Sequence, residues 1–271
     1  MEGEAGVVGT ALPKPVRPSA SLRAVSSVSL LTLMQLLLQF GTQLLMARYF
    51  GTSGEVDAFM AAVALPLVIA AMVSGSLGYV LVPMIAEALA RQSAADAAAI
   101  ARQVGLGVLI LSVLLAVLVA CLAAPLIALL CPGFAAEEQT LAAGQLRVLS
   151  VLILANCLTA YLNALYHSYG QFTRPAIAGV VGTFVMLVYV WQLHAQQGIY
   201  SLPWGMVAGS ATTIAILLPL FAAQFAARAP QGRGLHPGTW RAVGLLTPLV
   251  LGAVVWRLDP IVDRFLGSFL D

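Results

Sequence analysis

The sequence predicts an all-α integral membrane protein with about seven transmembrane helices. Hydrophobic residues make up 61% of the chain and charged residues only 9%, whereas a soluble domain carries roughly 25% charged residues. Several apolar blocks exceed the roughly 18 residues that mark a spanning helix. Backbone N–H and C=O groups in lipid need internal partners, so blocks of this length form helices. The short alternating segments of a membrane barrel do not occur.

The apolar blocks place helices at about 25–49, 57–86, 101–130, 141–167, 175–195, 201–227 and 242–269. The first helix follows a polar, proline-rich tail that lacks the apolar core and cleavage site of a signal peptide. Polar outer loops, around 132–140 and 196–200, separate the third helix from the fourth and the fifth from the sixth. Pro175 and Pro203 stand near the starts of their helices, where proline is favoured. Prolines inside the apolar blocks are tolerated in spanning helices.

The placement of basic residues predicts a cytoplasmic N-terminus. Cytoplasmic segments of membrane proteins are enriched in Lys and Arg. With the N-terminus inside, nine of the basic residues lie on or next to the cytoplasmic side: Lys14, Arg17, Arg23, Arg91, Arg102, Arg174, Arg228, Arg233 and Arg241. Only Arg48 and Arg147 lie towards the outer side. We therefore expect a multi-pass protein of the cytoplasmic (inner) membrane.

The chain divides into four parts. Residues 1–24 form the cytoplasmic tail, residues 25–228 a six-helix lobe, residues 229–241 a basic Pro- and Gly-rich linker, and residues 242–271 a seventh helix. A weak internal repeat relates the first helix to the last, since Leu30-Leu31-Thr32 and Leu245-Leu246-Thr247 open both. If the repeat is real, the seventh helix begins a second lobe in the same orientation. Parallel repeats of that kind are a transporter architecture.

The first helix carries a polar stripe. Gln35, Gln39, Thr42 and Gln43 follow the spacing i, i+4, i+7, i+8, which places all four on one face of a helix. An amide that faces lipid without a partner is unfavourable. The stripe therefore faces other helices or a water-filled cavity. Hydrogen bonding between helices and the polar wall of a substrate cavity are the two interpretations.

The last helix carries charges near its middle. They are Arg257, Asp259 and Asp263, with Arg264 closer to the outer end, where it can snorkel. Charges at this depth are unfavourable and usually mark an ion or substrate path. We expect Arg257, Asp259 and Asp263 to face the substrate cavity. The alternative is a neutralising pair such as Arg257–Asp263 that satisfies only the helix.

Other polar residues favour structure over chemistry. Arg48 and Asp57 flank the first outer loop and are predicted to form a salt bridge across it, near the gate of the cavity. The three histidines are isolated and have no metal-ligand spacing, and the three cysteines form no disulfide framework. Gly105-Leu106-Gly107 lies in an apolar helix and is predicted to be a packing site rather than a phosphate loop. We expect no enzyme, no bound cofactor and no nucleic-acid partner.

Residues 47–66, ARYFGTSGEVDAFMAAVALP, resemble the MurJ/MviN family of lipid II flippases. The shared pattern is A-R-x-F-G, then Asp57-Ala58-Phe59, then Leu65-Pro66. Weaker matches follow at Val82-Pro83, Pro132-Gly133-Phe134, Gly170-Gln171-Phe172, Thr247-Pro248 and Leu266-Gly267-Ser268. The resemblance runs over about residues 25–271.

The resemblance implies two six-helix lobes around a central cavity, as in the wider superfamily of multidrug antiporters and polysaccharide flippases. It implies alternating access that carries a polyprenyl-diphosphate-linked glycan, lipid II in peptidoglycan synthesis, from the inner to the outer leaflet. A coupling cation, Na⁺ or H⁺, is implied in the second lobe, with a carboxylate of the seventh helix contributing. The partners are then membrane lipid, the glycan lipid and the second lobe, of which this chain holds only the first helix.

The sequence departs from the family where the family carries arginines that face the cavity and are thought to bind the diphosphate. The aligned positions hold Leu36, Thr42, Ala70 and Ala71. Arg pairs with phosphate through two hydrogen bonds, so this lobe alone would bind a diphosphate weakly, and Arg257 would have to compensate. Three alternatives remain: a flippase for another lipid-linked polysaccharide, a cation-coupled small-molecule antiporter, and a non-transporting membrane scaffold.

Overall fold

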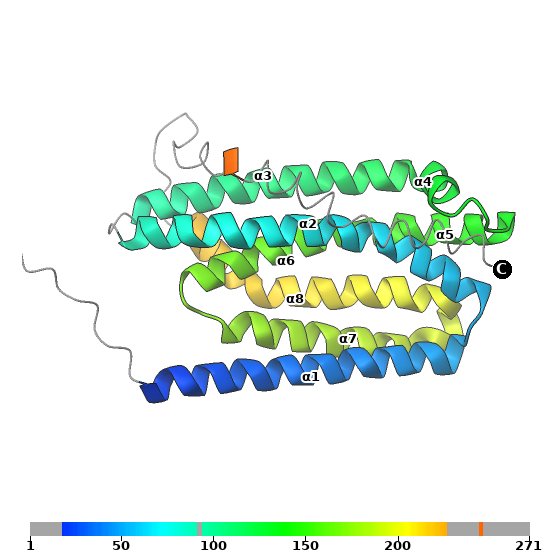
Figure 1. The fold of residues 1–271 in the computed structure, drawn as a ribbon, viewed down its shortest axis with the longest axis horizontal. Coiled ribbons are helices and arrows are strands. Elements are labelled where there is room, and N and C mark those ends of the chain that lie inside the picture. The colour runs from blue at the N-terminus through cyan, green and yellow to red at the C-terminus, as the bar shows by residue number, and fades with distance from the viewer. Residues whose placement is uncertain (1–17, 91–93, 227–243, 246–271) are drawn as a thin grey trace, which may run out of the picture.

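The structure, a computed structural model, describes residues 18–90, 94–226 and 244–245. Its regular elements are all helical, as predicted: α1 (Pro18–Phe50), α2 (Gly54–Ala90), α3 (Ala94–Cys121), α4 (Ala123–Leu130), α5 (Ala136–Leu149), α6 (Val151–Ser168), α7 (Thr173–Gln197), the 3₁₀ turn η1 (Gly198–Tyr200) and α8 (Ser201–Ala226). The long helices run along a common axis and form one bundle (Figure 1). The predicted seventh helix, 242–269, lies outside the described residues except for positions 244–245.

Five segments of the described chain are long and apolar enough to cross a membrane. They span residues 26–50, 54–90, 95–121, 136–168 and 173–219. The last segment contains both α7 and α8, which fold back on each other at η1 and make the most extensive helix–helix contact of the bundle. A polypeptide with this series of apolar helices is a multi-pass membrane protein.

The predicted single helix at 101–130 is two helices in the structure, because the chain breaks at Leu122 between α3 and α4. Leu122 leaves helical geometry there, with φ −93° and ψ 12°. The cause is Pro125, which has no N–H to donate to the carbonyl of Cys121 and whose ring would collide with that carbonyl. Pro125 then lies in the first turn of α4, where proline is tolerated. By contrast, α5 and α6 meet at Ser150, which keeps the helical φ and ψ.

Two glycines allow the tight reversals at the end of the bundle where α1 finishes. Gly51 follows α1 with φ +62°, and its N–H donates to the carbonyl of Ala47 at 3.1 Å. Gly198 follows α7 with φ +56°. Residues with a Cβ rarely adopt this left-handed geometry, so glycine is the residue that lets these helices end and turn back.

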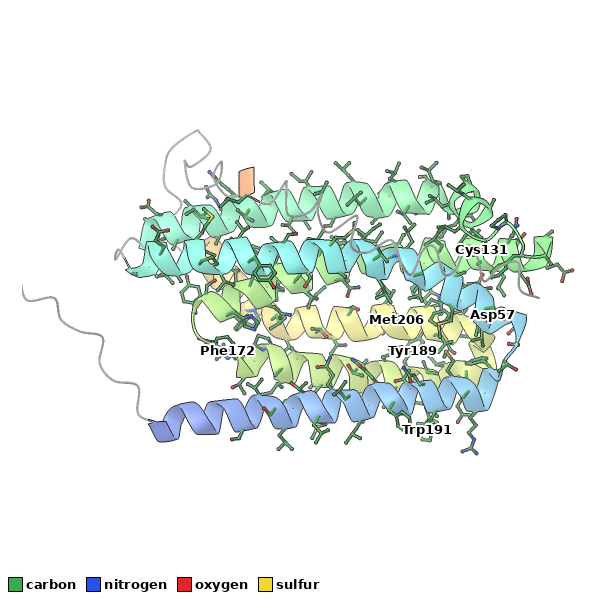
Figure 2. The ribbon with its side chains drawn as sticks, viewed as in Figure 1. Asp57, Cys131, Phe172, Tyr189, Trp191 and Met206 are labelled. Carbon is green, nitrogen blue, oxygen red and sulfur yellow. The ribbon has the colours of Figure 1, made fainter. Side chains whose placement is uncertain are left out.

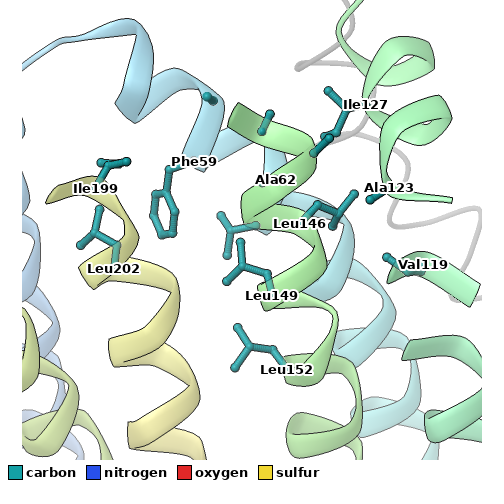
Figure 3. Close-up of a cluster of buried hydrophobic side chains, with 14 of the residues drawn as sticks. Phe59, Ala62, Val119, Ala123, Ile127, Leu146, Leu149, Leu152, Ile199 and Leu202 are labelled. Atoms are coloured by element: carbon teal, nitrogen blue, oxygen red, sulfur yellow. The ribbon is translucent and has the colours of Figure 1, made fainter. Parts of the chain in front are cut away.

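The core lies where α2, α5, α6 and α8 meet. Phe59, Leu146, Leu149, Leu152 and Leu202 are buried in one apolar cluster that joins these helices (Figure 3). By contrast, α1 packs mainly on α7 and has only 6% of its most apolar stretch buried. Its outer leucines are therefore the surface that a bilayer covers.

Two buried tyrosines connect α6 to its neighbours. The hydroxyl of Tyr161 donates to the carbonyl of Ala101 on α3 at 2.7 Å, and that of Tyr166 donates to the carbonyl of Leu217 on α8 at 3.2 Å. The Tyr161 ring lies directly over Gly105, where a Cβ would come within 2.6 Å of the ring. Gly105 is therefore a packing site, as predicted, because only a residue without a side chain fits beneath this ring.

Candidate functional site

The polar stripe of α1 faces cavities inside the bundle. Gln39, Thr42 and Gln43 line one cavity, and Gln35 lines a second. α1 packs closely on α7 at Gly41, where a Cβ would lie 3.0 Å from Leu187. This contact determines which face of α1 points towards the other helices. The four side chains thus point towards other helices or water, and the leucines on the rest of α1 point outward.

The first cavity, which we call the glutamine groove, has a volume of about 380 Å³. Its polar strip comes from α1, and the opposite walls are mostly apolar. The lining is Gln39, Thr42, Gln43 and Met46 of α1; Phe59, Met60, Val63 and Leu67 of α2; Thr183 and Met186 of α7; and Leu202 and Met206 of α8. Methionine side chains are flexible and polarisable, so this wall can adapt to ligands of different shape.

The second cavity, which we call the amide pocket, has a volume of about 300 Å³. It lies between α1, α6, α7 and α8. The lining is Gln35 of α1; Asn156, Thr159 and Asn163 of α6; Pro175, Gly179, Gly182, Thr183 and Met186 of α7; and Met206, Gly209, Ser210 and Thr213 of α8. Thr183, Met186 and Met206 line both cavities, so the pocket and the groove share a wall; Met206 is labelled in Figure 2.

No charged side chain lines either cavity within the described part of the chain. At the positions aligned with the family's arginines, Thr42 lines the groove, while Leu36 is exposed and Ala70 is buried. The Thr42 hydroxyl donates to the carbonyl of Leu38 at 3.0 Å, one turn earlier in its own helix. The described lobe therefore offers hydrogen bonds and apolar contact to a ligand, and no cation for a phosphate.

Arg48 and Asp57 flank the turn between α1 and α2, and both are exposed; Asp57 lies at that end of the bundle (Figure 2). The guanidinium of Arg48 lies 6.0 Å from the ring centroid of Tyr49, a cation–π distance. Tyr49 in turn stacks on His194 of α7, with centroids 3.7 Å apart and rings inclined by 11°. The salt bridge between Arg48 and Asp57 stays a prediction.

The stack of Tyr49 on His194 connects the end of α1 to the end of α7. Sequence reasoning missed it, because His194 looked isolated along the chain. The ring of His194 is held by its Nδ1, which lies 2.9 Å from the carbonyl of Trp191.

The other predicted cavity residues, Arg257, Asp259 and Asp263, lie outside the described residues. The amide pocket, in turn, contains residues that sequence reasoning did not single out. Asn156, Thr159 and Asn163 follow the spacing i, i+3, i+7, so they form a polar stripe on one face of α6, and this spacing was the signal that could have found them. Among the described residues, no group of three or more His, Cys, Asp or Glu side chains could hold a metal ion.

Comparisons with known proteins agree with this fold. A sequence model of the family described as lipid II flippase MurJ matches residues 46–271. A probable lipid II flippase MurJ from Buchnera aphidicola subsp. Acyrthosiphon pisum is 22% identical over 255 residues, and the lipid II flippase MurJ of Burkholderia cenocepacia is 23% identical over 257 residues. Each alignment covers 92% of this chain and 50% of the relative. The chain thus spans about half the length of the curated relatives it matches.

Solved structures give the same result for the fold. A lipid II flippase MurJ in an inward closed conformation matches with a TM-score of 0.69 and 21% identity, covering 90% of this chain and 51% of that one. A transporter of the MOP superfamily from Pyrococcus furiosus, whose binding pocket is described as having reverse polarity, matches with a TM-score of 0.69 and 17% identity. That alignment covers 89% of this chain and 54% of the other.

Proposed function

The chain belongs to the MurJ family of lipid II flippases, and we propose that it forms one lobe of a transporter that moves a polyprenyl-diphosphate-linked glycan across a membrane. The first-choice cargo is lipid II or a similar peptidoglycan precursor, carried from the inner to the outer leaflet. The family is one of transporters rather than enzymes, and the proposed role is transport.

The observation that carries the proposal is the amphipathic lining of the glutamine groove in a chain of this family. Gln39 and Gln43 offer hydrogen bonds on one side, and Met60, Val63 and Leu67 offer an apolar wall on the other. A glycan lipid has the same two parts, a polar headgroup and a hydrocarbon chain. The groove is walled by α1, whose most apolar stretch is only 6% buried, so a lipid could enter it from the bilayer.

Alternating access would move this lobe against a second one around the groove. The charged residues of the predicted helix at 242–269 would then serve two roles. Arg257 would supply the cation for the diphosphate that the described cavities lack, and Asp259 or Asp263 would contribute to a site for a coupling Na⁺ or H⁺. Carboxylates inside a membrane commonly take such roles.

We place the protein in the bacterial cytoplasmic membrane with its N-terminus in the cytoplasm. The end of the bundle where α1 begins is also where α3 and α7 begin (Figure 1). Arg174 lies in the first turn of α7, and Arg102 lies in the first half of α3. This is the side that the enrichment of Lys and Arg in cytoplasmic segments favours. The test is to introduce single cysteines at this end and add a membrane-impermeant thiol reagent outside the cell. The cysteines should not react, and their reaction would contradict the orientation.

The deciding experiment is complementation. The full gene is expressed in cells depleted of their own lipid II flippase, and survival is scored with membrane insertion checked by immunoblot. Survival supports lipid II as the cargo. Survival that persists in an Arg257→Ala variant removes this residue from the proposed role. Death despite insertion contradicts lipid II as the cargo.

A flippase for another lipid-linked polysaccharide is the second candidate, because both described cavities are uncharged. Reconstitution of the full protein into vesicles distinguishes the two. Transfer of a polyprenyl-linked glycan without a stem peptide, in the absence of lipid II transfer, favours the second candidate. Transport of cationic drugs instead would indicate an antiporter, and no transport of any of these would indicate a scaffold.

A further inference from the structure

The amide pocket gathers neutral hydrogen-bonding groups in the interior of the lobe. Its lining includes three carboxamides, from Gln35, Asn156 and Asn163. Hydroxyls from Thr159, Thr183, Ser210 and Thr213 add to them. A carboxamide both donates and accepts hydrogen bonds, as does a hydroxyl. Such a set is well suited to a ligand that also does both.

Part of this capacity is already used by the protein backbone. The hydroxyl of Thr183 donates to the carbonyl of Gly179 at 2.9 Å, and that of Thr213 donates to the carbonyl of Gly209 at 3.1 Å. These bonds lie within α7 and α8 and satisfy the donors of both threonines. The acceptor side of each hydroxyl remains for a ligand.

Unlike the two threonine hydroxyls, at least one carboxamide of the pocket has an atom without a hydrogen-bond partner in the protein. The Oδ1 atom of Asn163 is buried and has no hydrogen-bond partner. The carboxamide of Gln35 lies against Gly179, where a Cβ would come within 3.0 Å of its Oε1 and 3.3 Å of its Nε2. Buried polar atoms are nearly always paired with protein, water or ligand, so an unpaired amide oxygen at a cavity wall marks a place for a bound group.

We propose that the amide pocket binds one uncharged sugar unit of the transported glycan lipid, through its hydroxyl and N-acyl groups. The inference rests on the proposed function and adds the chemistry of recognition by this lobe. An ionised group would enter the pocket without an opposite charge in its lining, which is strongly unfavourable. A pocket of about 300 Å³ is at the small end of the range for ligand sites, roughly 300–1,000 Å³, and so fits a single sugar rather than a whole headgroup.

The position of the pocket agrees with this role. Because Thr183, Met186 and Met206 line both cavities, a lipid whose chain follows the glutamine groove can place its nearest sugar beside or inside the amide pocket. The diphosphate then stays outside the pocket. Recognition in this lobe thus depends on the sugar and not on the phosphates.

The test compares two probes on the full-length protein in nanodiscs. One probe is a polyprenyl diphosphate without a sugar, and the other is the same lipid carrying a single N-acetylhexosamine. The pocket variants are Asn163→Leu and Thr159→Val, the second keeping the shape of the side chain. The matched control is Thr212→Val, because the hydroxyl of Thr212 donates to the carbonyl of Ala208 in its own helix at 2.9 Å and lines neither cavity.

The wild-type protein should bind the sugar-bearing lipid more tightly than the sugar-free lipid. A pocket variant should raise the Kd of the sugar-bearing lipid by about tenfold, the equivalent of one buried hydrogen bond, and leave the Kd of the sugar-free lipid unchanged. The control variant should bind both lipids as the wild type does. Either pocket variant, provided that it elutes as a single folded species, decides the question.

Equal Kd values for the two lipids, or equal weakening of both by the pocket variants, would overturn the inference while the proposed function stands. If the protein binds neither lipid, the proposed function fails and the inference fails with it. The two failures are therefore distinguishable from one set of titrations.

Discussion

Replacing Gly105 with alanine would place a methyl group against the ring of Tyr161, where α3 packs on α6. The new Cβ would lie 2.6 Å from Cζ and Oη of the tyrosine and 3.0 Å from Cε1. Carbon atoms in contact prefer about 3.5–4.0 Å, so the ring would have to retreat by roughly 1 Å. Tyr161 is 1% exposed and its hydroxyl is hydrogen-bonded to Ala101, so the ring has little room to move.

The expected destabilisation is about 1–3 kcal/mol, the range for overpacking a well-packed core. Alanine also favours a helix over glycine by about 1 kcal/mol, which would hide part of the effect. Gly107 supplies the control, because it lies on the same helix and a Cβ there meets nothing within 4 Å. The helix preference is common to both variants. The difference between Gly105→Ala and Gly107→Ala therefore isolates the contact with Tyr161.

The measurement is the free energy of unfolding of the full protein in mixed micelles, titrated with a denaturing detergent. Gly105→Ala should unfold more easily than Gly107→Ala by about 1–3 kcal/mol. Removing the ring in a Gly105→Ala/Tyr161→Ala double variant should abolish the penalty of the alanine, because residues in contact are not additive. A difference below about 0.5 kcal/mol between the two single variants would refute the packing of α3 on this ring.

Two further outcomes are expected. Tyr166→Phe should lower the free energy of unfolding by about 1 kcal/mol in the same assay, because it removes the hydrogen bond to the carbonyl of Leu217 from a fully buried site; an unchanged value would show that this bond adds no net stability. Gln43→Cys in a background without the native cysteines should react with a membrane-impermeant thiol reagent, since it lines the glutamine groove, whereas Leu37→Cys on the outer surface of α1 should be shielded by lipid. Reaction at Leu37→Cys without reaction at Gln43→Cys would reverse the assigned faces of this helix.

Apolar length and periodicity were enough to predict the helices at 25–49 and 57–86, because α1 and α2 each follow one continuous apolar block. The same reasoning predicted one continuous helix at 101–130 and missed the break between α3 and α4. Hydropathy does not register that Pro125 removes a donor and blocks a carbonyl one turn earlier. The polar stripe of α1 was predicted as one surface, yet the fold divides it between two cavities. Of the other helices, α7 and α8 line both cavities, whereas α6 contributes only to the cavity at Gln35 and α2 only to the glutamine groove.

The amide pocket was beyond sequence reasoning for a different reason. Asn156 and Asn163 on α6, Gly179 on α7 and Ser210 on α8 come from three helices, and no spacing along the chain brings them together. The stack of Tyr49 on His194 likewise joins residues 145 positions apart along the sequence (194 − 49).

The amino-acid sequence is enough to assign the class of the protein, since a chain so poor in charge and without alternating segments satisfies its backbone in lipid as a bundle of helices. It also determined which face of α1 is polar, because helical periodicity is a local property. What that face contacts depends on how distant segments pack, which is visible only in the folded bundle. Without a strong hydrophobic force between helices in lipid, their partners are chosen by close packing at small residues such as Gly41, Gly105 and Gly182, and packing between distant segments leaves no local signal in the chain.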